Sequence, residues 1–213
     1  MSKPVRVAFV VEGDTDLIML QAAVRSLLQD RELVPTLLQP QDSAVLESGG
    51  DPTGVGWPGV HRWCRQTARN AGGQVRNDLL FRNHDVLVIQ LDADVAGKTY
   101  KSAHIAENIQ DLPCERPCPP PSDTTDALRA ILLRWMGERA MPPAAVFCTP
   151  SRSLEAWVFA ALHSGDKIVL PGGLECRKRP ESLLVGRPPK LLSRKGNRYQ
   201  KDPRSGLING ARG

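Results

Sequence analysis

Two groups of carboxylates follow apolar runs of the sequence, and together they suggest metal-dependent chemistry. They are Glu12 and Asp16, after residues 7–11, and Asp92 and Asp94, after residues 86–91. Four carboxylates around one cleft would repel one another and raise each other's pKa values, and a divalent cation would remove that cost. Because every donor is an oxygen atom, Mg²⁺ or Mn²⁺ is favoured over zinc, which prefers His and Cys.

The elements that must position these acids are two strands of a parallel sheet. Apolar runs of five or six residues without polar alternation are typical of strands buried on both faces. In such sheets function gathers beyond the carboxyl ends of the strands. Adjacent strands over residues 5–11 and 85–91 would therefore bring the four acids to one cleft. The expected fold is α/β, with a mostly parallel sheet flanked by helices.

A β-α-β unit is expected at the start of the chain. Apolar residues at helical spacing predict a helix over residues 16–29, with Asp14 or Thr15 as its N-terminal cap. A short strand over residues 33–38 then completes the unit, which is normally a right-handed crossover.

The rest of the chain alternates helices with turns. Expected are helices over 59–71 and 123–135, a weak helix ending at 109, a strand over 146–148, and a following helix capped by Ser151 or Ser153. Five prolines between residues 113 and 121 make that stretch an extended connector.

Lys98 and Glu155 are further candidates for the acidic site. Lys98 could neutralise negative charge in a transition state, or it could be a solvated surface lysine. Glu155 stands in the first turn of its helix, where a carboxylate favours the helix dipole in any case. Its alternative role is as a ligand or hydrogen-bonding group at the metal site.

Charge is distributed unevenly along the chain, although the formal net charge is only +5. Residues 1–164 carry 16 Lys and Arg against 19 Asp and Glu, whereas residues 165–213 carry 12 against 4. We expect a catalytic domain over 1–164 and a basic, Pro- and Gly-rich extension over 165–213. Such an asymmetry fits a polyanionic substrate held through its phosphates, although a basic tail can also serve solubility alone.

Several basic residues are candidates for nucleic-acid contacts. They are Lys190, Arg194, Lys195, Arg198 and Lys201 in the extension, and Arg62, Arg65 and Arg69 on the helix over 59–71. The three arginines recur near helical spacing beside Trp57 and Trp63, which could stack on unpaired bases. A solvated helix face is the alternative. In the extension, residues 183–185 and 191–192 are expected to pack on the core while residues 194–204 meet phosphate.

The five cysteines are odd in number and scattered, which predicts reduced thiols in a cytoplasmic protein. Cys114 and Cys118 lack a second Cys or His pair at metal spacing, so zinc is not expected there. No apolar run approaches the roughly 20 residues that cross a bilayer, so no membrane partner is expected.

Three motifs in order give the chain a family resemblance. They are Glu12-Gly13-x-x-Asp16, Asp92-x-Asp94 and Ser153-x-Glu155-x-Trp157, each after an expected strand. With them, residues 5–163 resemble a Toprim domain, and in particular the small stand-alone OLD/RloB-like Toprim nucleases of bacterial defence loci. The resemblance implies a compact Rossmann-like module in which Glu12, Asp92 and Asp94 are the functional acids. Asp16 matches the extra acid of the OLD-like branch.

The expected function is metal-dependent hydrolysis of phosphodiester bonds in DNA or RNA, in the context of phage defence. Glu12, Asp92 and Asp94 would hold one or two ions, with help from Asp16 or Glu155. A topoisomerase is not expected, because the sequence lacks a strand-passage domain. The alternative is a non-catalytic Toprim scaffold or sensor that binds nucleic acid and a partner ATPase. A receiver-like domain is less favoured, since the strand over 146–148 is not followed by a lysine.

Overall fold

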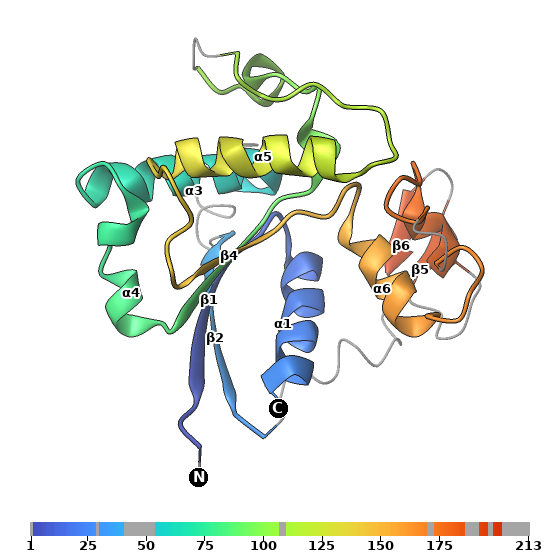
Figure 1. Cartoon of the computed structure of the whole chain (residues 1–213), viewed down its shortest axis with the longest axis horizontal. Coiled ribbons are helices and arrows are strands. Elements are labelled where there is room, and N and C mark those ends of the chain that lie inside the picture. The colour runs from blue at the N-terminus through green and yellow to red at the C-terminus, as the bar shows by residue number, and fades with distance from the viewer. Residues whose placement is uncertain are drawn as a thin grey trace.

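A parallel sheet forms the centre of the molecule in the computed structural model (Figure 1). The structure describes residues 2–28, 30–40, 54–106, 110–169, 173–185, 192–195 and 198–201. Within these ranges the sheet has four strands, all parallel, in the order β2-β1-β3-β4. The strands are β1 (Val5–Val10), β2 (Leu33–Gln39), β3 (Val86–Gln90) and β4 (Ala145–Cys148). This confirms the α/β class and the parallel sheet.

The two central strands are β1 and β3, as their unbroken apolar runs predict. Phe9, Val10, Leu87 and Ile89 are fully buried. In the pairing of the two strands, Val10 lies opposite Ile89. Both strands therefore end at the same edge of the sheet, and the residues that follow them emerge side by side.

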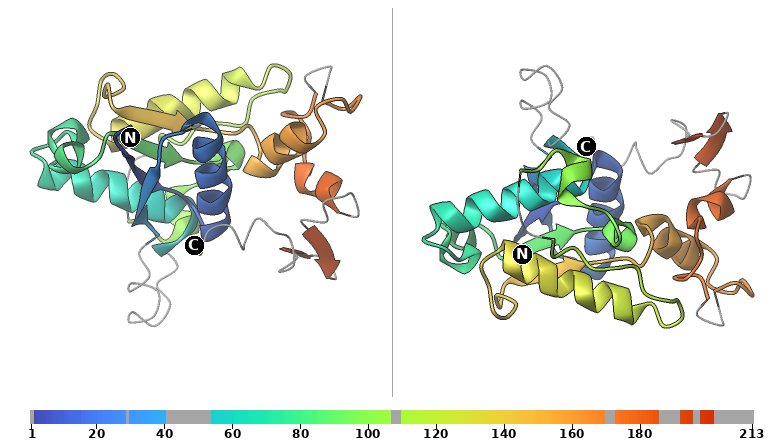
Figure 2. Two further views of the ribbon diagram at one scale, coloured as in Figure 1. Left: turned by 90° about the horizontal axis from the view of Figure 1, so that it is seen from below. Right: turned by 90° about the horizontal axis from the view of Figure 1, so that it is seen from above.

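Helices cover both faces of the sheet. They are α1 (Asp14–Leu28), α3 (Gly56–Asn70), α4 (Leu80–Asn83), α5 (Ser122–Trp135) and α6 (Leu154–Leu162), with short 3₁₀ turns η2 (Val75–Asn77), η3 (Ala93–Val95), η4 (Tyr100–Ala103) and η5 (Pro180–Leu184). On one face α3 and α5 pack on the side chains of Ala8, Val10 and Ile89. On the other face α1 and the first turn of α6 pack on Phe9 and Val88. Figure 2 shows the two layers from opposite sides.

Two helices begin earlier than the sequence predicts. The predicted capping role of Asp14 and Thr15 is wrong, because α1 starts at Asp14 and both residues lie in its first turn. The carbonyl of Gly13 already accepts the amide of Leu17 at 3.2 Å, so the helix follows Glu12 almost directly. Similarly, α3 starts at Gly56 rather than at residue 59.

The weak helix expected up to residue 109 is not formed in the described residues. Instead the chain makes the short turn η4, and residues 107–109 lie outside the described ranges. Thr99 caps this turn by accepting the amide of Ser102 at 3.2 Å. Burial of Tyr100, which is 1% exposed, pulls the segment into the core and stops a helix from continuing. His104 ends the turn in the left-handed region, at φ 56°.

The first part of the C-terminal extension packs against α6. Leu174, Leu183 and Leu184 are buried with Ala156 and Phe159 of that helix. The leucines at 183 and 184 therefore anchor the extension, whereas Leu191 lies outside the described residues. Further on, β5 (Leu192–Lys195) and β6 (Arg198–Lys201) pair as an antiparallel hairpin.

A disulfide joins the connector to the extension and corrects the prediction of reduced thiols throughout. Cys118 and Cys176 are bonded, with 5.3 Å between their Cα atoms and a sequence separation of 58. Cys64 and Cys148 are buried free thiols, and Cys114 is an exposed one. The pairing depends on the extension returning to the proline-rich connector, which cysteine spacing cannot reveal.

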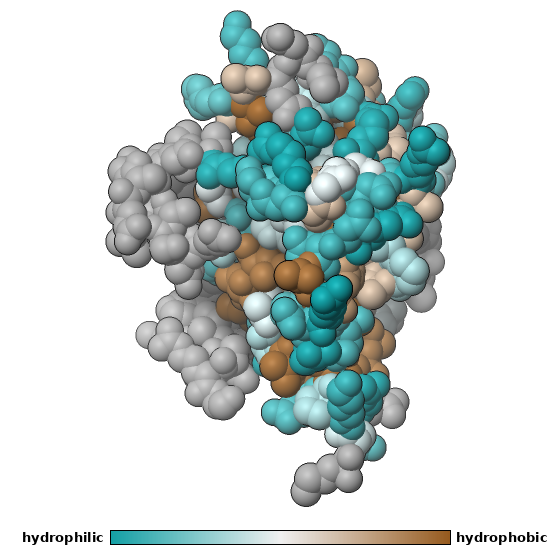
Figure 3. Space-filling model, turned by 90° about the vertical axis from the view of Figure 1, so that its left-hand side faces the viewer, coloured by the Kyte–Doolittle hydropathy of each residue, from teal (hydrophilic) through white to brown (hydrophobic). Residues whose placement is uncertain are grey.

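The surface is mostly polar on the face shown in Figure 3, where hydrophobic side chains gather near the middle of the view. Among the described helices, none is long and apolar enough to cross a membrane.

Candidate active site

Glu12 and Asp92 meet at the carboxyl edge of the two central strands. The amide of Asp92 donates to Oε1 of Glu12 at 2.7 Å, which joins the segment after β1 to the segment after β3. Beyond β3 the chain stays fixed to the segment after β4, because Ala93 donates its amide to the carbonyl of Pro150 at 2.9 Å. The edge predicted from the sequence therefore exists, and its backbone is held on both sides.

Gln90 ties the two acids together and was not singled out by the sequence analysis. Its side chain is fully buried at the end of β3. Its Oε1 accepts the amide of Glu12 at 2.9 Å, and its Nε2 donates to Oδ1 of Asp92 at 2.7 Å. The available signal was an amide side chain that closes an otherwise apolar strand, because such a group needs partners when it is buried.

The start of α3 contacts Glu12 from a third direction. The amide of Gly56 donates to the carbonyl of Glu12 at 2.8 Å. Gly56 has φ +65°, a conformation that favours glycine, and a Cβ atom there would lie 3.9 Å from Oε2 of Glu12. The earlier start of α3 thus brings a helix N-terminus next to the Glu12 carboxyl group.

Burial and mutual repulsion raise the pKa values of both central acids. The pKa of Glu12 rises from 4.5 to about 7, mainly through burial, with Asp94 and Asp16 adding to the rise. The pKa of Asp92 rises from 3.8 to about 9, again mainly through burial, followed by the charge of Glu12. Asp16, Asp94 and Glu155 also raise the pKa of Asp92, so all five predicted acids interact at one edge.

Lys98 is the predicted cation that reaches this cluster. Its Nζ lies 3.1 Å from Oδ1 of Asp94, four residues earlier, and both side chains are partly exposed. An ion pair this exposed adds little stability. The positive charge of Lys98 also lowers the pKa of the buried Glu12.

Glu175 brings another carboxylate to the site from the extension, and no local motif predicts it. Its Oε2 accepts the amide of Ser151 at 3.0 Å, and its Oε1 accepts from the indole of Trp157. Burial, together with the negative charges of Asp92, Asp16 and Glu175, raises the pKa of Cys148 to about 12. Glu175 therefore lies beside the end of β4, close to the acids of the other strands.

The predicted helix cap at α6 is only partly present. Ser153 occupies the cap position but makes no hydrogen bond to the helix within the described residues, and Ser151 is buried and bonded through its backbone to Glu175. Glu155 lies in the first turn, as expected.

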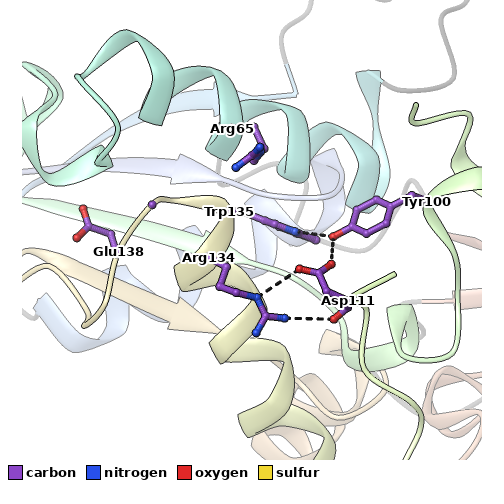
Figure 4. Close-up of a pocket in the computed structure, with 7 residues that line it drawn as sticks. Arg65, Tyr100, Asp111, Arg134, Trp135 and Glu138 are labelled. Atoms are coloured by element: carbon purple, nitrogen blue, oxygen red, sulfur yellow. Dashed lines mark hydrogen bonds and ion pairs between the residues drawn. The ribbon is translucent and has the colours of Figure 1, made fainter. Parts of the chain in front are cut away.

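The arginines predicted on α3 do not form one exposed row. Arg62 and Arg69 are exposed, but Arg65 is half-buried and lines a cavity of about 380 Å³ with Tyr100 and Arg134 (Figure 4). Trp57 is not available for base stacking, because it is 6% exposed and stacks on Trp135 in the core. Trp63 is partly buried against the same core.

Polar contacts along the cavity in Figure 4 join Tyr100 and Asp111, which precede the connector, to α5. Tyr100 donates its hydroxyl to Asp111 at 2.6 Å and accepts the indole N–H of Trp135 at 2.9 Å. Nε of Arg134 lies 3.3 Å from Oδ2 of Asp111. These contacts explain the cavity as part of the packing around the connector.

Four of the five basic residues predicted in the extension belong to the β5–β6 hairpin. Arg194, Lys195, Arg198 and Lys201 are in its two strands, and Lys190 lies outside the described residues.

The acids at the sheet edge are not arranged as a ready-made cage. Within the described ranges, no three His, Cys, Asp or Glu side chains stand together as metal ligands. Oε1 of Glu12 and Oδ1 of Asp92 accept the hydrogen bonds from the amide of Asp92 and from Nε2 of Gln90.

Comparison with known proteins gives no match of any kind. No protein-family model, no curated protein and no solved structure matches this chain.

Proposed function

We propose that the protein is a Toprim-type nuclease that uses Mg²⁺ or Mn²⁺ to hydrolyse phosphodiester bonds in DNA or RNA. The observation that supports it most is the hydrogen-bonded pair of Glu12 and Asp92 at the end of adjacent parallel strands. The strand-Glu-Gly and strand-Asp-x-Asp motifs agree with this arrangement in their order. The basic residues after position 164 fit a polyanionic substrate.

The chemistry of the donors fits a hard divalent cation. The carboxylates that act on one another at this edge offer oxygen atoms as ligands, and burial leaves Glu12 and Asp92 with raised pKa values that a cation would lower. Glu12, Asp92 and Asp94 would hold the ion, with Asp16 or Glu155 in support. When bound, such an ion activates water and stabilises the leaving oxygen of a phosphodiester.

The chain's own groups then have distinct tasks. Gln90 orients both central acids through its two hydrogen bonds. Lys98, paired with Asp94 on the open side of the site, would turn to the phosphate and neutralise its charge. A role in phage defence, with an ATPase or another defence subunit as partner, belongs to the same proposal and comes from the family resemblance.

Cleavage assays with matched variants test the proposal. Wild-type protein with Mg²⁺ or Mn²⁺ is expected to cut DNA or RNA, and Glu12→Gln and Asp92→Asn are expected to lose at least 100-fold in rate, roughly the effect of one lost electrostatic catalytic group. Asp30→Asn, an exposed carboxylate beyond the far end of α1, is the matched control and should cut normally. Unchanged cleavage by both site variants would refute the assignment. Binding without turnover under every metal would instead favour the scaffold.

A further inference from the structure

A second, basic cavity lies where the proline-rich connector meets the extension. Its volume is about 380 Å³, and its charged lining is Arg116, Arg152, Lys178 and Glu115, beside the disulfide between Cys118 and Cys176. Three cations therefore face one carboxylate. Because cations gathered around a concave surface raise the local concentration of anions, this cavity favours a negatively charged ligand.

Arg152 is only partly satisfied in this cavity. One Nη atom pairs with Glu115, and the side chain is 19% exposed. Its Nε is buried and has no hydrogen-bond partner within the described residues, and the same is true of the hydroxyl of the next residue, Ser153. A buried donor without an acceptor destabilises a fold, and the cost is larger when the group is charged. An anion bound beside the guanidinium of Arg152 would reduce that cost.

The cavity adjoins the acidic edge of the sheet. Ser151, next to Arg152, donates its amide to Glu175, and Glu175 precedes Cys176 in the cavity wall. Glu175 and Asp92 both raise the pKa of the Cys148 thiol at the end of β4. A chain of phosphates that crosses the acids would therefore meet Arg152 and Lys178 next.

The two walls of the cavity are covalently joined. Arg116 comes from the connector and Lys178 from the extension, and the disulfide links these segments at positions 118 and 176. The amide of Arg116 also donates to Thr124 of α5 at 3.0 Å, which holds the connector wall. A site held in place before binding loses less entropy when its ligand arrives.

We propose that this cavity is a phosphate subsite, which holds a backbone phosphate of the nucleic-acid strand adjacent to the one at the acidic edge. This inference rests on the proposed function, since the ligand is the same strand. Glu115 tunes the subsite, because it holds Arg152 in position while repelling the incoming phosphate.

Binding of a labelled single-stranded oligonucleotide in EDTA, followed by anisotropy across salt concentrations, tests the subsite without cleavage. Lys178→Gln is expected to weaken binding and to lower the log–log salt slope by about 0.7, the value for one phosphate contact on a single strand. Arg177→Gln is the matched control, because Arg177 is exposed beside Lys178 but does not line the cavity. Glu115→Gln should tighten binding, since it removes the negative charge and keeps an acceptor for Arg152.

The outcomes separate the subsite from the catalytic proposal. Equal affinity and slope for Lys178→Gln and Arg177→Gln would overturn the subsite, even if Asp92→Asn abolishes cleavage. Conversely, a reduced slope for Lys178→Gln supports the subsite even if wild-type protein cuts nothing. Thermal shifts with inorganic phosphate alone decide the source of the anion. If phosphate stabilises wild type but not Lys178→Gln, and oligonucleotide binding is the same in both, the cavity takes free phosphate and the strand assignment is wrong.

Discussion

The metal-free acidic site should make the protein less stable as pH rises. Folding raises the pKa of Glu12 from 4.5 to about 7 and that of Asp92 from 3.8 to about 9. For a carboxyl group whose pKa is higher in the folded state, the favourable contribution is complete below the unfolded pKa and is lost as pH rises through the folded pKa. Stability from this pair should therefore fall between about pH 4 and about pH 9.

A lower bound on this loss of stability comes from Glu12, whose pKa changes less on folding than that of Asp92. At about 1.4 kcal/mol for each pH unit, the change at Glu12 alone corresponds to roughly 3 kcal/mol. For a chain of this length, 1 kcal/mol moves the melting temperature by roughly 2–4 °C, so Glu12 alone should lower it by roughly 6–12 °C between pH 5 and pH 8, and Asp92 should add to that loss.

Asp92→Asn isolates this contribution from the other titrating groups. The variant keeps an oxygen that can accept from Gln90 and removes the carboxyl group whose pKa changes most on folding. Thermal unfolding in EDTA should show a smaller loss between pH 5 and pH 8 for the variant than for wild type. Mn²⁺ at pH 8 should raise the melting temperature of wild type far more than that of the variant, with Asp30→Asn behaving as wild type. Parallel pH profiles for wild type and Asp92→Asn would refute the reasoning.

Three further predictions concern groups that position the site. Gln90→Met should lower the affinity for Mn²⁺, measured by calorimetry, and cost about 1–3 kcal/mol of stability, because it leaves the backbone amide of Glu12 unpaired. Gln66→Met, on the exposed face of α3, should change neither quantity, and equal Mn²⁺ affinity in both variants would argue against a positioning role for Gln90. Thiol titration in denaturant without reductant should find three thiols, and five reactive thiols would exclude the disulfide. Cys118→Ser should lower the free energy of unfolding by about 4 kcal/mol, because the disulfide closes a loop with a sequence separation of 58. Leu184→Ala should lower stability by about 2–5 kcal/mol and expose the extension to limited proteolysis, whereas Leu162→Ala, on the exposed side of α6, should do neither. Equal digestion of the two variants would contradict the idea that Leu184 anchors the extension to α6.

The main elements of the sheet could be predicted from the sequence because their signals are local. An apolar run that is buried on both faces needs no partner to be recognised, which is why β1 and β3 were placed to within a residue or two at each end. The acids that follow them were placed at one edge by a general rule about parallel strands. The predicted direction of their pKa changes is confirmed, but the main cause is burial, and repulsion between the acids comes second.

Predictions from local sequence patterns were wrong where a contact between distant segments decides whether a side chain is buried. Trp57 stands beside arginines in the sequence, yet it is buried because α3 begins three residues early and turns that side chain toward Trp135. Arg65 has helical spacing with its neighbours, but it lines a cavity made with Tyr100 and Arg134.

By itself, the sequence determined that the chain would form a parallel α/β sheet with Glu12, Asp92 and Asp94 at its carboxyl edge, because hydrophobic periodicity and strand direction are properties of short segments. Only the tertiary structure decided how those acids are held and what lies next to them. The bonds from Gln90, the arrival of Glu175 and the disulfide that closes the basic cavity each join segments far apart in the chain, or depend on how a buried side chain points. No pattern in a single sequence encodes such pairings, since they depend on how packed elements meet in space.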